Sequence, residues 1–117
     1  MRLSSIAKVL EADWLSDGVG PLDLEIATCF AADLMSEVLA FCAPGALLVT
    51  GLANIQAVHT ANLAELAGII FINEKRPPQA VLDAAREQDV PLLTTALTMF
   101  DACGRLYEHG IQPARKG

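Results

Sequence analysis

The chain has 117 residues, of which 53% are hydrophobic and 19% are charged. This length fits one domain, and the high apolar content with low charge excludes an intrinsically disordered protein. The net charge of −6 argues against nucleic-acid binding, because clustered cations supply most of the affinity for phosphate backbones. Apolar runs such as 66–72 are far shorter than the roughly 20 residues of a membrane span. Because the first residues lack a secretory signal, we expect a cytoplasmic domain without nucleic-acid or membrane partners.

The N-terminal residues predict a helix followed by a turn. Residues 3–12 carry apolar side chains at helical spacing, and Ser4 or Ser5 can cap the first turn through a hydroxyl oxygen. The glycines and the proline in 17–21 are typical of a turn, because glycine tolerates positive φ and proline fixes its own. The first predicted element therefore ends before residue 17.

An extended segment and a second helix are expected next. Residues 23–32 alternate roughly between larger apolar and other side chains, which favours a strand. Asp33 is a suitable N-cap for a helix over 34–42, because its carboxylate can accept a free backbone N–H. The expected apolar face of this helix consists of Leu34, Val38 and Phe41.

The remaining sequence alternates regularly between apolar runs of strand length and helical patterns. Strands are predicted at 46–50, 68–73 and 91–95, and helices at 54–66, 76–89 and 98–109. Such alternation predicts a three-layer α/β/α fold with a mixed, mostly parallel sheet of four to six strands. The three apolar strands should be central, because burial on both faces produces continuous apolar runs. Thr98 and Asp101 resemble a capping box, and residues 111–117 are expected to form a flexible tail.

Motifs of catalysis are missing from the sequence. It contains no P-loop, no dinucleotide-binding glycine fingerprint and no nucleophile elbow. All four serines lie in the first third of the chain, away from the predicted strand-to-helix turns. We therefore expect a protein that is not an enzyme.

Cysteine and histidine usage gives little support for a metal site. Cys29, Cys42 and Cys103 are widely separated and form no CxxC pair, and His59 and His109 are the only histidines. The cysteines are predicted to be reduced thiols packed as small hydrophobic groups. We expect neither a metal nor a cofactor.

A candidate ligand site follows from where the polar residues fall in the predicted fold. Ligands of open α/β sheets bind at the carboxyl ends of parallel strands, where helix N-termini present free N–H groups to anions. The hydroxyl, amide and glycine groups at these ends are Thr50, Gly51, Asn54, Asn73, Thr94, Thr95 and Thr98. Lys75 could supply a countercharge. Helix capping alone also explains residues such as Asn54, so both readings stay open.

Several short segments follow one another in a characteristic order, namely 32–36, 44–50, 54–58, 92–95 and 102–107. In this order they resemble the DRTGG domain family, which is similar to the N-terminal domain of HPr kinase/phosphorylase and more distantly to Mur ligase N-terminal domains. The resemblance implies a three-layer α/β/α fold and a regulatory or binding role, with a nucleotide as candidate ligand. The Asp-Arg-Thr-Gly-Gly string itself is absent, so roles tied to it do not transfer.

Two functions remain in competition. The first is a regulatory module that binds a small anionic ligand, such as a nucleotide, at the strand ends. The second is a protein-interaction or oligomerisation module that serves a partner enzyme or kinase. Self-association as a homodimer is expected, because a small chain with this apolar content must cover it and twofold dimers are the commonest oligomers.

Overall fold

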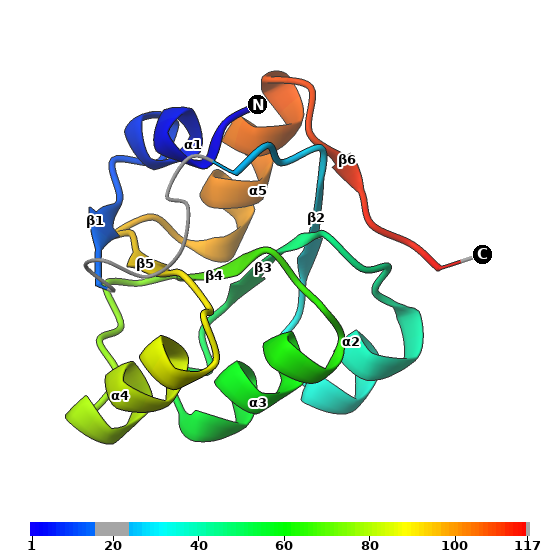
Figure 1. Ribbon diagram of the computed structural model, residues 1–117. Coiled ribbons are helices and arrows are strands. Elements are labelled where there is room, and N and C mark those ends of the chain that lie inside the picture. Colours follow the sequence, from blue (N-terminus) through cyan, green and yellow to red (C-terminus); the bar gives the residue numbers. More distant parts are fainter. Residues whose placement is uncertain (16–23, 117) are drawn as a thin grey trace.

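A computed structural model describes residues 1–15 and 24–116, so the turn expected at 17–21 lies outside the described residues. Its centre is a six-stranded sheet in the order β1-β5-β4-β3-β2-β6 (Figure 1). Strands β2 to β6 are mutually parallel, and β1 is antiparallel to β5. The strands are β1 (Asp13–Trp14), β2 (Thr28–Ala31), β3 (Leu47–Thr50), β4 (Gly68–Phe71), β5 (Leu92–Thr94) and β6 (Gln112–Pro113). The predicted mixed, mostly parallel sheet is confirmed.

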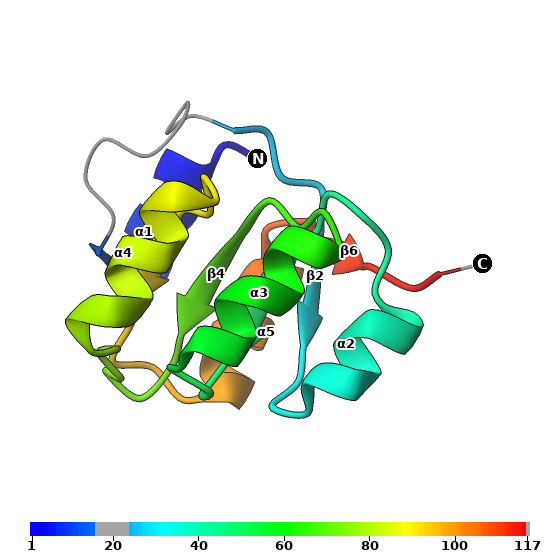
Figure 2. The ribbon, with the colours of Figure 1, turned by 60° about the horizontal axis from the view of Figure 1, so that its bottom comes forward.

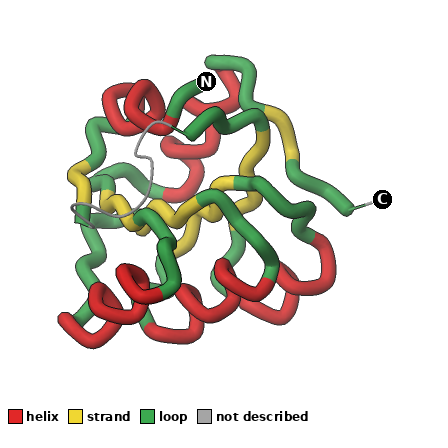
Figure 3. The backbone as a smooth tube through the Cα atoms, viewed as in Figure 1, coloured by secondary structure: helices red, strands yellow, loops and turns green. Residues whose placement is uncertain are grey.

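Helices cover both faces of the sheet, as Figures 2 and 3 show. One layer holds α2 (Met35–Phe41), α3 (Ile55–Leu63) and α4 (Gln79–Glu87), and the other holds α1 (Leu3–Val9) and α5 (Met99–Glu108). The predicted central position of β3, β4 and β5 is confirmed, and every residue of these strands is buried. Within β3, Leu48 packs against the α2–α4 layer, whereas Leu47 and Val49 pack against the other layer.

The start of the chain differs from the sequence prediction in two details. Helix α1 begins at Leu3 with Arg2 in the N-cap position, so Ser4 and Ser5 lie inside the helix rather than at its cap. The strand expected over 23–32 is confined to β2, because residues 24–27 contribute only an isolated bridge, between Glu25 and Arg2.

Helix α2 buries a different face from the one that the sequence pattern predicted. Its N-cap position is Leu34, not Asp33, and its buried residues are Met35 and Val38, followed by Cys42 at the C-cap. Leu34 and Phe41 are each 59% exposed. Val38 is buried as predicted, but Met35 and Cys42 are buried in place of Leu34 and Phe41, which leaves these two large apolar side chains largely in solvent.

The C-terminal segment is held against the domain, contrary to the expected flexible tail. Strand β6 pairs with β2, and the Ala114 N–H donates to the Cys29 carbonyl at 3.0 Å. Lys116 donates from its backbone N–H to the Phe41 carbonyl and from its Nζ to the Leu39 carbonyl, both at 2.9 Å. These contacts satisfy carbonyls at the end of α2, where a cation is also favoured by the helix dipole. Among the described residues, no helix is long and apolar enough to cross a membrane.

Candidate functional site

The ends of β2 and β3 are joined by one carboxylate at the carboxyl edge of the sheet. Asp33 Oδ1 accepts hydrogen bonds from the Gly51 N–H at 2.7 Å and from Thr50 Oγ1 at 3.0 Å. Thr50 Oγ1 in turn accepts the Leu52 N–H at 3.1 Å. Asp33 therefore fixes the loop that leads from β3 into α3, instead of capping α2 as predicted. The sequence signal for this role was an acidic residue two positions after the end of a strand.

Asn54 and Thr98 occupy the N-caps that the sequence predicted. The Asn54 side chain accepts the Ala57 N–H at 3.2 Å at the start of α3. Thr98 accepts the Asp101 N–H at 3.3 Å and donates its hydroxyl to Asp101 Oδ2 at 2.9 Å. Asp101 thus reaches back to the hydroxyl of the cap rather than to its backbone N–H, which distinguishes the pair from a regular capping box.

The hydroxyls of Thr94 and Thr95 are directed to protein acceptors. Both residues are buried. Thr94 Oγ1 donates to the Lys75 carbonyl at 2.8 Å, and Thr95 Oγ1 donates to the Leu10 carbonyl at 2.6 Å. These hydrogen bonds connect the end of β5 to the loop after β4 and to the end of α1. The two threonines therefore have a structural role at this edge.

The loop after β4 folds back through a tight turn that contains Asn73. Asn73 and Glu74 both have positive φ, at 55° and 56°, and the Lys75 N–H closes the turn on the Ile72 carbonyl at 3.1 Å. The Asn73 N–H donates to the Leu97 carbonyl at 2.9 Å. Asn73, Thr94 and Thr95 are thereby brought together, while Thr50 and Gly51 form a separate cluster with Asp33.

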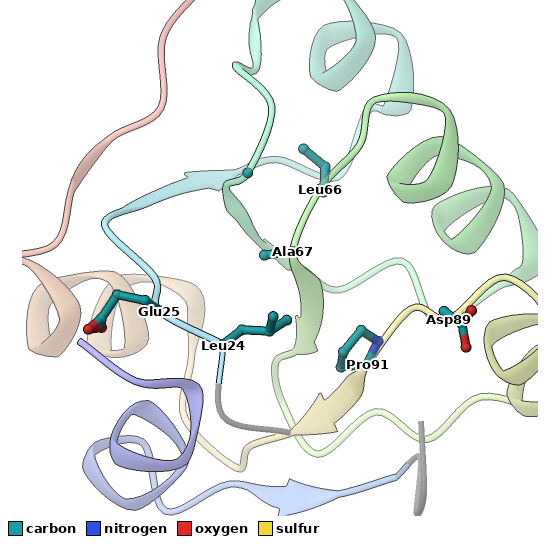
Figure 4. A pocket seen from close by; sticks show the side chains of 7 residues that line it. Leu24, Glu25, Leu66, Ala67, Asp89 and Pro91 are labelled. Carbon is teal, nitrogen blue, oxygen red and sulfur yellow. The ribbon is translucent and has the colours of Figure 1, made fainter. Parts of the chain in front are cut away.

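A cavity of about 530 Å³ lies at the opposite, amino-terminal edge of the sheet (Figure 4). It is lined by Leu24, Glu25, Gly45, Leu66, Ala67, Asp89 and Pro91, and none of the predicted site residues is among them. Ala67 and Pro91 directly precede β4 and β5, and Gly45 lies two residues before β3. Its charged lining is two carboxylates, of which Glu25 pairs with the N-terminal amine at 2.8 Å. The amine balances the charge of Glu25, so the remaining charge on the described lining is the carboxylate of Asp89, which repels anions and does not suit the expected ligand.

The cysteines are free thiols, as predicted. Cys42 is fully buried, and Cys29 and Cys103 pack against the core beside α1 and α5. Burial, with the neighbouring Cys103 and Cys42 thiols, raises the pKa of Cys29 to about 11, and burial also raises the pKa values of the other two. Thiols with a raised pKa are poor nucleophiles at neutral pH, because little of the reactive thiolate is present. Residues 1–15 and 24–116 contain no group of three His, Cys, Asp or Glu residues that could hold a metal.

The sequence matches the family model of the DRTGG domain over residues 5–108. The chain therefore belongs to the DRTGG domain family. No curated protein sequence matches it significantly. Neither the family match nor the fold tests the expected similarity to HPr kinase/phosphorylase, which stays a prediction.

A solved structure with a similar fold is that of the CBS and DRTGG domains of the regulatory region of Clostridium perfringens pyrophosphatase, complexed with the activator diadenosine tetraphosphate. The TM-score is 0.71 at 14% sequence identity. The match covers 89% of this chain and 45% of the solved chain, so the present domain spans less than half of that regulatory region. At this identity the likeness establishes the fold.

Proposed function

We propose that this protein is a non-catalytic regulatory module that binds a small anionic ligand, such as a nucleotide, at the carboxyl edge of its sheet. The observation that carries this proposal is the fold shared with a pyrophosphatase regulatory region that is complexed with diadenosine tetraphosphate. Membership of the DRTGG family supports the regulatory part. The proposed contacts are those of the seven predicted residues that reach solvent, namely Gly51, Asn54, Asn73 and Thr98, while the buried Thr50, Thr94 and Thr95 support this edge through their hydrogen bonds to the protein.

The start of α3 is the best anion-binding element of this edge. The first turn of α3 has no acidic residue, whereas α2 has Glu37 and α5 has Asp101 in theirs; α4 also lacks one, but its N-cap is Pro78, which provides no side-chain cap. Free N–H groups and the positive end of the helix dipole are therefore not opposed by a carboxylate within the helix itself. Asn54 caps the start of α3 through its side chain. Lys75 supplies an exposed cation at the same edge of the sheet.

A nucleotide panel tests this proposal directly. The melting temperature of the protein is measured with AMP, ADP, ATP and diadenosine tetraphosphate, and hits are confirmed by calorimetry. A specific ligand at a hundredfold excess over Kd stabilises the native state by about 2.7 kcal/mol. Asn54→Ala should weaken binding, and Asn54→Ser, which keeps the cap, serves as its matched control. If none of the nucleotides raises the melting temperature, the nucleotide proposal is wrong.

A second candidate function is supported by the surface. Within residues 1–15 and 24–116, seven large apolar side chains are exposed, namely Leu34, Leu39, Phe41, Ile55, Leu63, Phe100 and Tyr107. Exposed apolar groups that gather on one face mark sites of protein association. We propose on this ground that the domain forms a homodimer or binds a partner enzyme or kinase. Light scattering at increasing protein concentration distinguishes self-association from a monomer.

A further inference from the structure

The cavity at the amino-terminal edge of the sheet has the size and the walls of a small-molecule site. Its volume of about 530 Å³ falls within the roughly 300–1,000 Å³ of ligand pockets. A Cβ at Gly45 would meet nothing within 4 Å, so the wall at this residue is open. Most of the described lining is apolar or glycine, namely Leu24, Gly45, Leu66, Ala67 and Pro91. These walls can pack against the apolar body of a ligand.

The charged part of the described lining consists of two carboxylates. In the view of Figure 4, Glu25 and Asp89 lie on opposite sides of the cavity. Glu25 pairs with the N-terminal amine at 2.8 Å. The exposed Asp89 carboxylate accepts no hydrogen bond and forms no ion pair within residues 1–15 and 24–116. The described lining contains no Lys, Arg or His. One carboxylate at this cavity is therefore left without a cation.

The negative ends of two helix dipoles reach the same edge of the sheet. Helices α3 and α4 both end there, and each is followed within three residues by a lining residue, Leu66 and Asp89 respectively. A helix C-terminus carries about half a negative charge and favours cations. Arg86, in the last turn of α4, is exposed and does not line the cavity. Asp89 directly follows the C-cap of α4, so the dipole opposes its charge, and a bound cation would relieve this repulsion.

We propose that this cavity binds a small organic cation, in which a primary ammonium group is attached to an apolar body. The ammonium group pairs with Asp89 near the end of α4, and the apolar body packs between the walls. One free carboxylate matches one ammonium group, whereas a metal ion needs a larger set of oxygen ligands. The net charge of −6 also attracts cations. This second site lies at the opposite edge of the sheet from the proposed nucleotide site and does not depend on it.

Three indole compounds that share one ring system and differ in charge test the ligand class. At neutral pH tryptamine carries an ammonium group, tryptophol a hydroxyl group and indole-3-acetate a carboxylate. Calorimetric titration of the full chain should give the tightest binding for tryptamine and the weakest for indole-3-acetate. Equal binding of the three compounds, or no binding of tryptamine at millimolar concentration, would overturn the proposal.

Amide chemical shifts locate the bound tryptamine in the wild type. The N–H signals of Gly45, Leu66 and Ala67 should move during the titration, whereas those of Gly51 and Ala57 at the carboxyl edge should stay. The opposite pattern would rule out the cavity. Ala67→Leu adds apolar atoms at the lining and should abolish tryptamine binding, with the melting temperature verifying that the variant is folded. A folded variant that binds as the wild type does would also rule out the cavity.

Asp89→Asn tests the charge of the site. It should weaken tryptamine binding by about two- to fivefold, the range of an exposed ion pair, and asparagine tolerates the φ of 54° at this position. Glu74→Gln is the matched control, because it removes an exposed carboxylate at a φ of 56° from the carboxyl edge. At physiological ionic strength the control should leave the dissociation constant unchanged. Equal weakening by both variants would mean that net charge, and not Asp89, attracts the ligand. The nucleotide panel is independent of all these measurements.

Discussion

The carboxylate of Asp33 and the backbone N–H of Gly51 are joined by a hydrogen bond of 2.7 Å across the ends of β2 and β3. The same carboxylate oxygen accepts the hydroxyl of the buried Thr50. A negative charge therefore occupies two of the donors that the sequence assigned to an anionic ligand. This arrangement makes Asp33 a test residue for both stability and binding.

Asp33→Ala should destabilise the domain by about 1–3 kcal/mol, because it leaves the buried Thr50 hydroxyl without its acceptor. Asp33→Asn keeps an oxygen at this position and should cost less. Urea unfolding of the two variants and the wild type measures both effects. Equal stability of all three proteins would show that Asp33 does not hold the loop.

Asp33→Asn should also tighten binding of a nucleotide that is found in the panel. The substitution removes a negative charge near the start of α3, so repulsion of an anionic ligand falls. Calorimetry of the wild type and the variant gives the ratio of dissociation constants, which should fall several-fold. Weaker binding by the variant would mean that Asp33 contacts the ligand favourably instead of opposing it.

Asn54→Ala should lower the free energy of unfolding by about 1 kcal/mol, because the Ala57 N–H loses its side-chain acceptor. Asn54→Ser should stay close to the wild type, because serine is an equally good cap. Chemical denaturation measures these differences. A stability of Asn54→Ala indistinguishable from the wild type would rule out a capping role.

Gly68→Ala should destabilise the sheet by about 1–3 kcal/mol through overpacking. A Cβ at this position would lie 3.1 Å from the Pro91 carbonyl oxygen, and backbone in a central strand cannot easily move. Gly104→Ala is the control, since its Cβ would meet nothing within 4 Å in α5. Its alanine should stabilise the helix by up to about 1 kcal/mol. Thermal unfolding of the pair should therefore show shifts of opposite sign.

Cys29 should react slowly with iodoacetamide at neutral pH, because its pKa is raised to about 11 and little thiolate is present. Its labelling rate should rise steeply as the pH approaches 11. In the unfolded chain the thiol has its ordinary pKa of 9.0, so the rate should rise at a lower pH. Folding stability should fall over the same window, since the unfolded state loses its proton first. Mass spectrometry of labelled peptides measures the rates, and fast labelling at neutral pH would contradict the burial of this thiol.

Local pattern was sufficient for much of the architecture. The apolar runs around Leu48, Ile70 and Leu93 predict central strands because only strands buried on both faces need such runs. Asn54 and Thr98 predict helix starts because a cap bonds to N–H groups two or three residues away. Each of these interactions is contained within a few neighbouring residues, which is why the amino-acid sequence by itself determined them.

Tertiary structure decided the contacts between segments that are distant in sequence. The parallel register that sets Ala31 beside Val49 carries Asp33 to Gly51 two residues later, and this register cannot be seen in either segment alone. Likewise, the polar C-terminal segment has the sequence pattern of a tail, and it forms β6 only because the edge of β2 offers unpaired backbone groups to it. Backbone pairing across the sheet depends on which strands become neighbours, a choice made by packing of the whole chain.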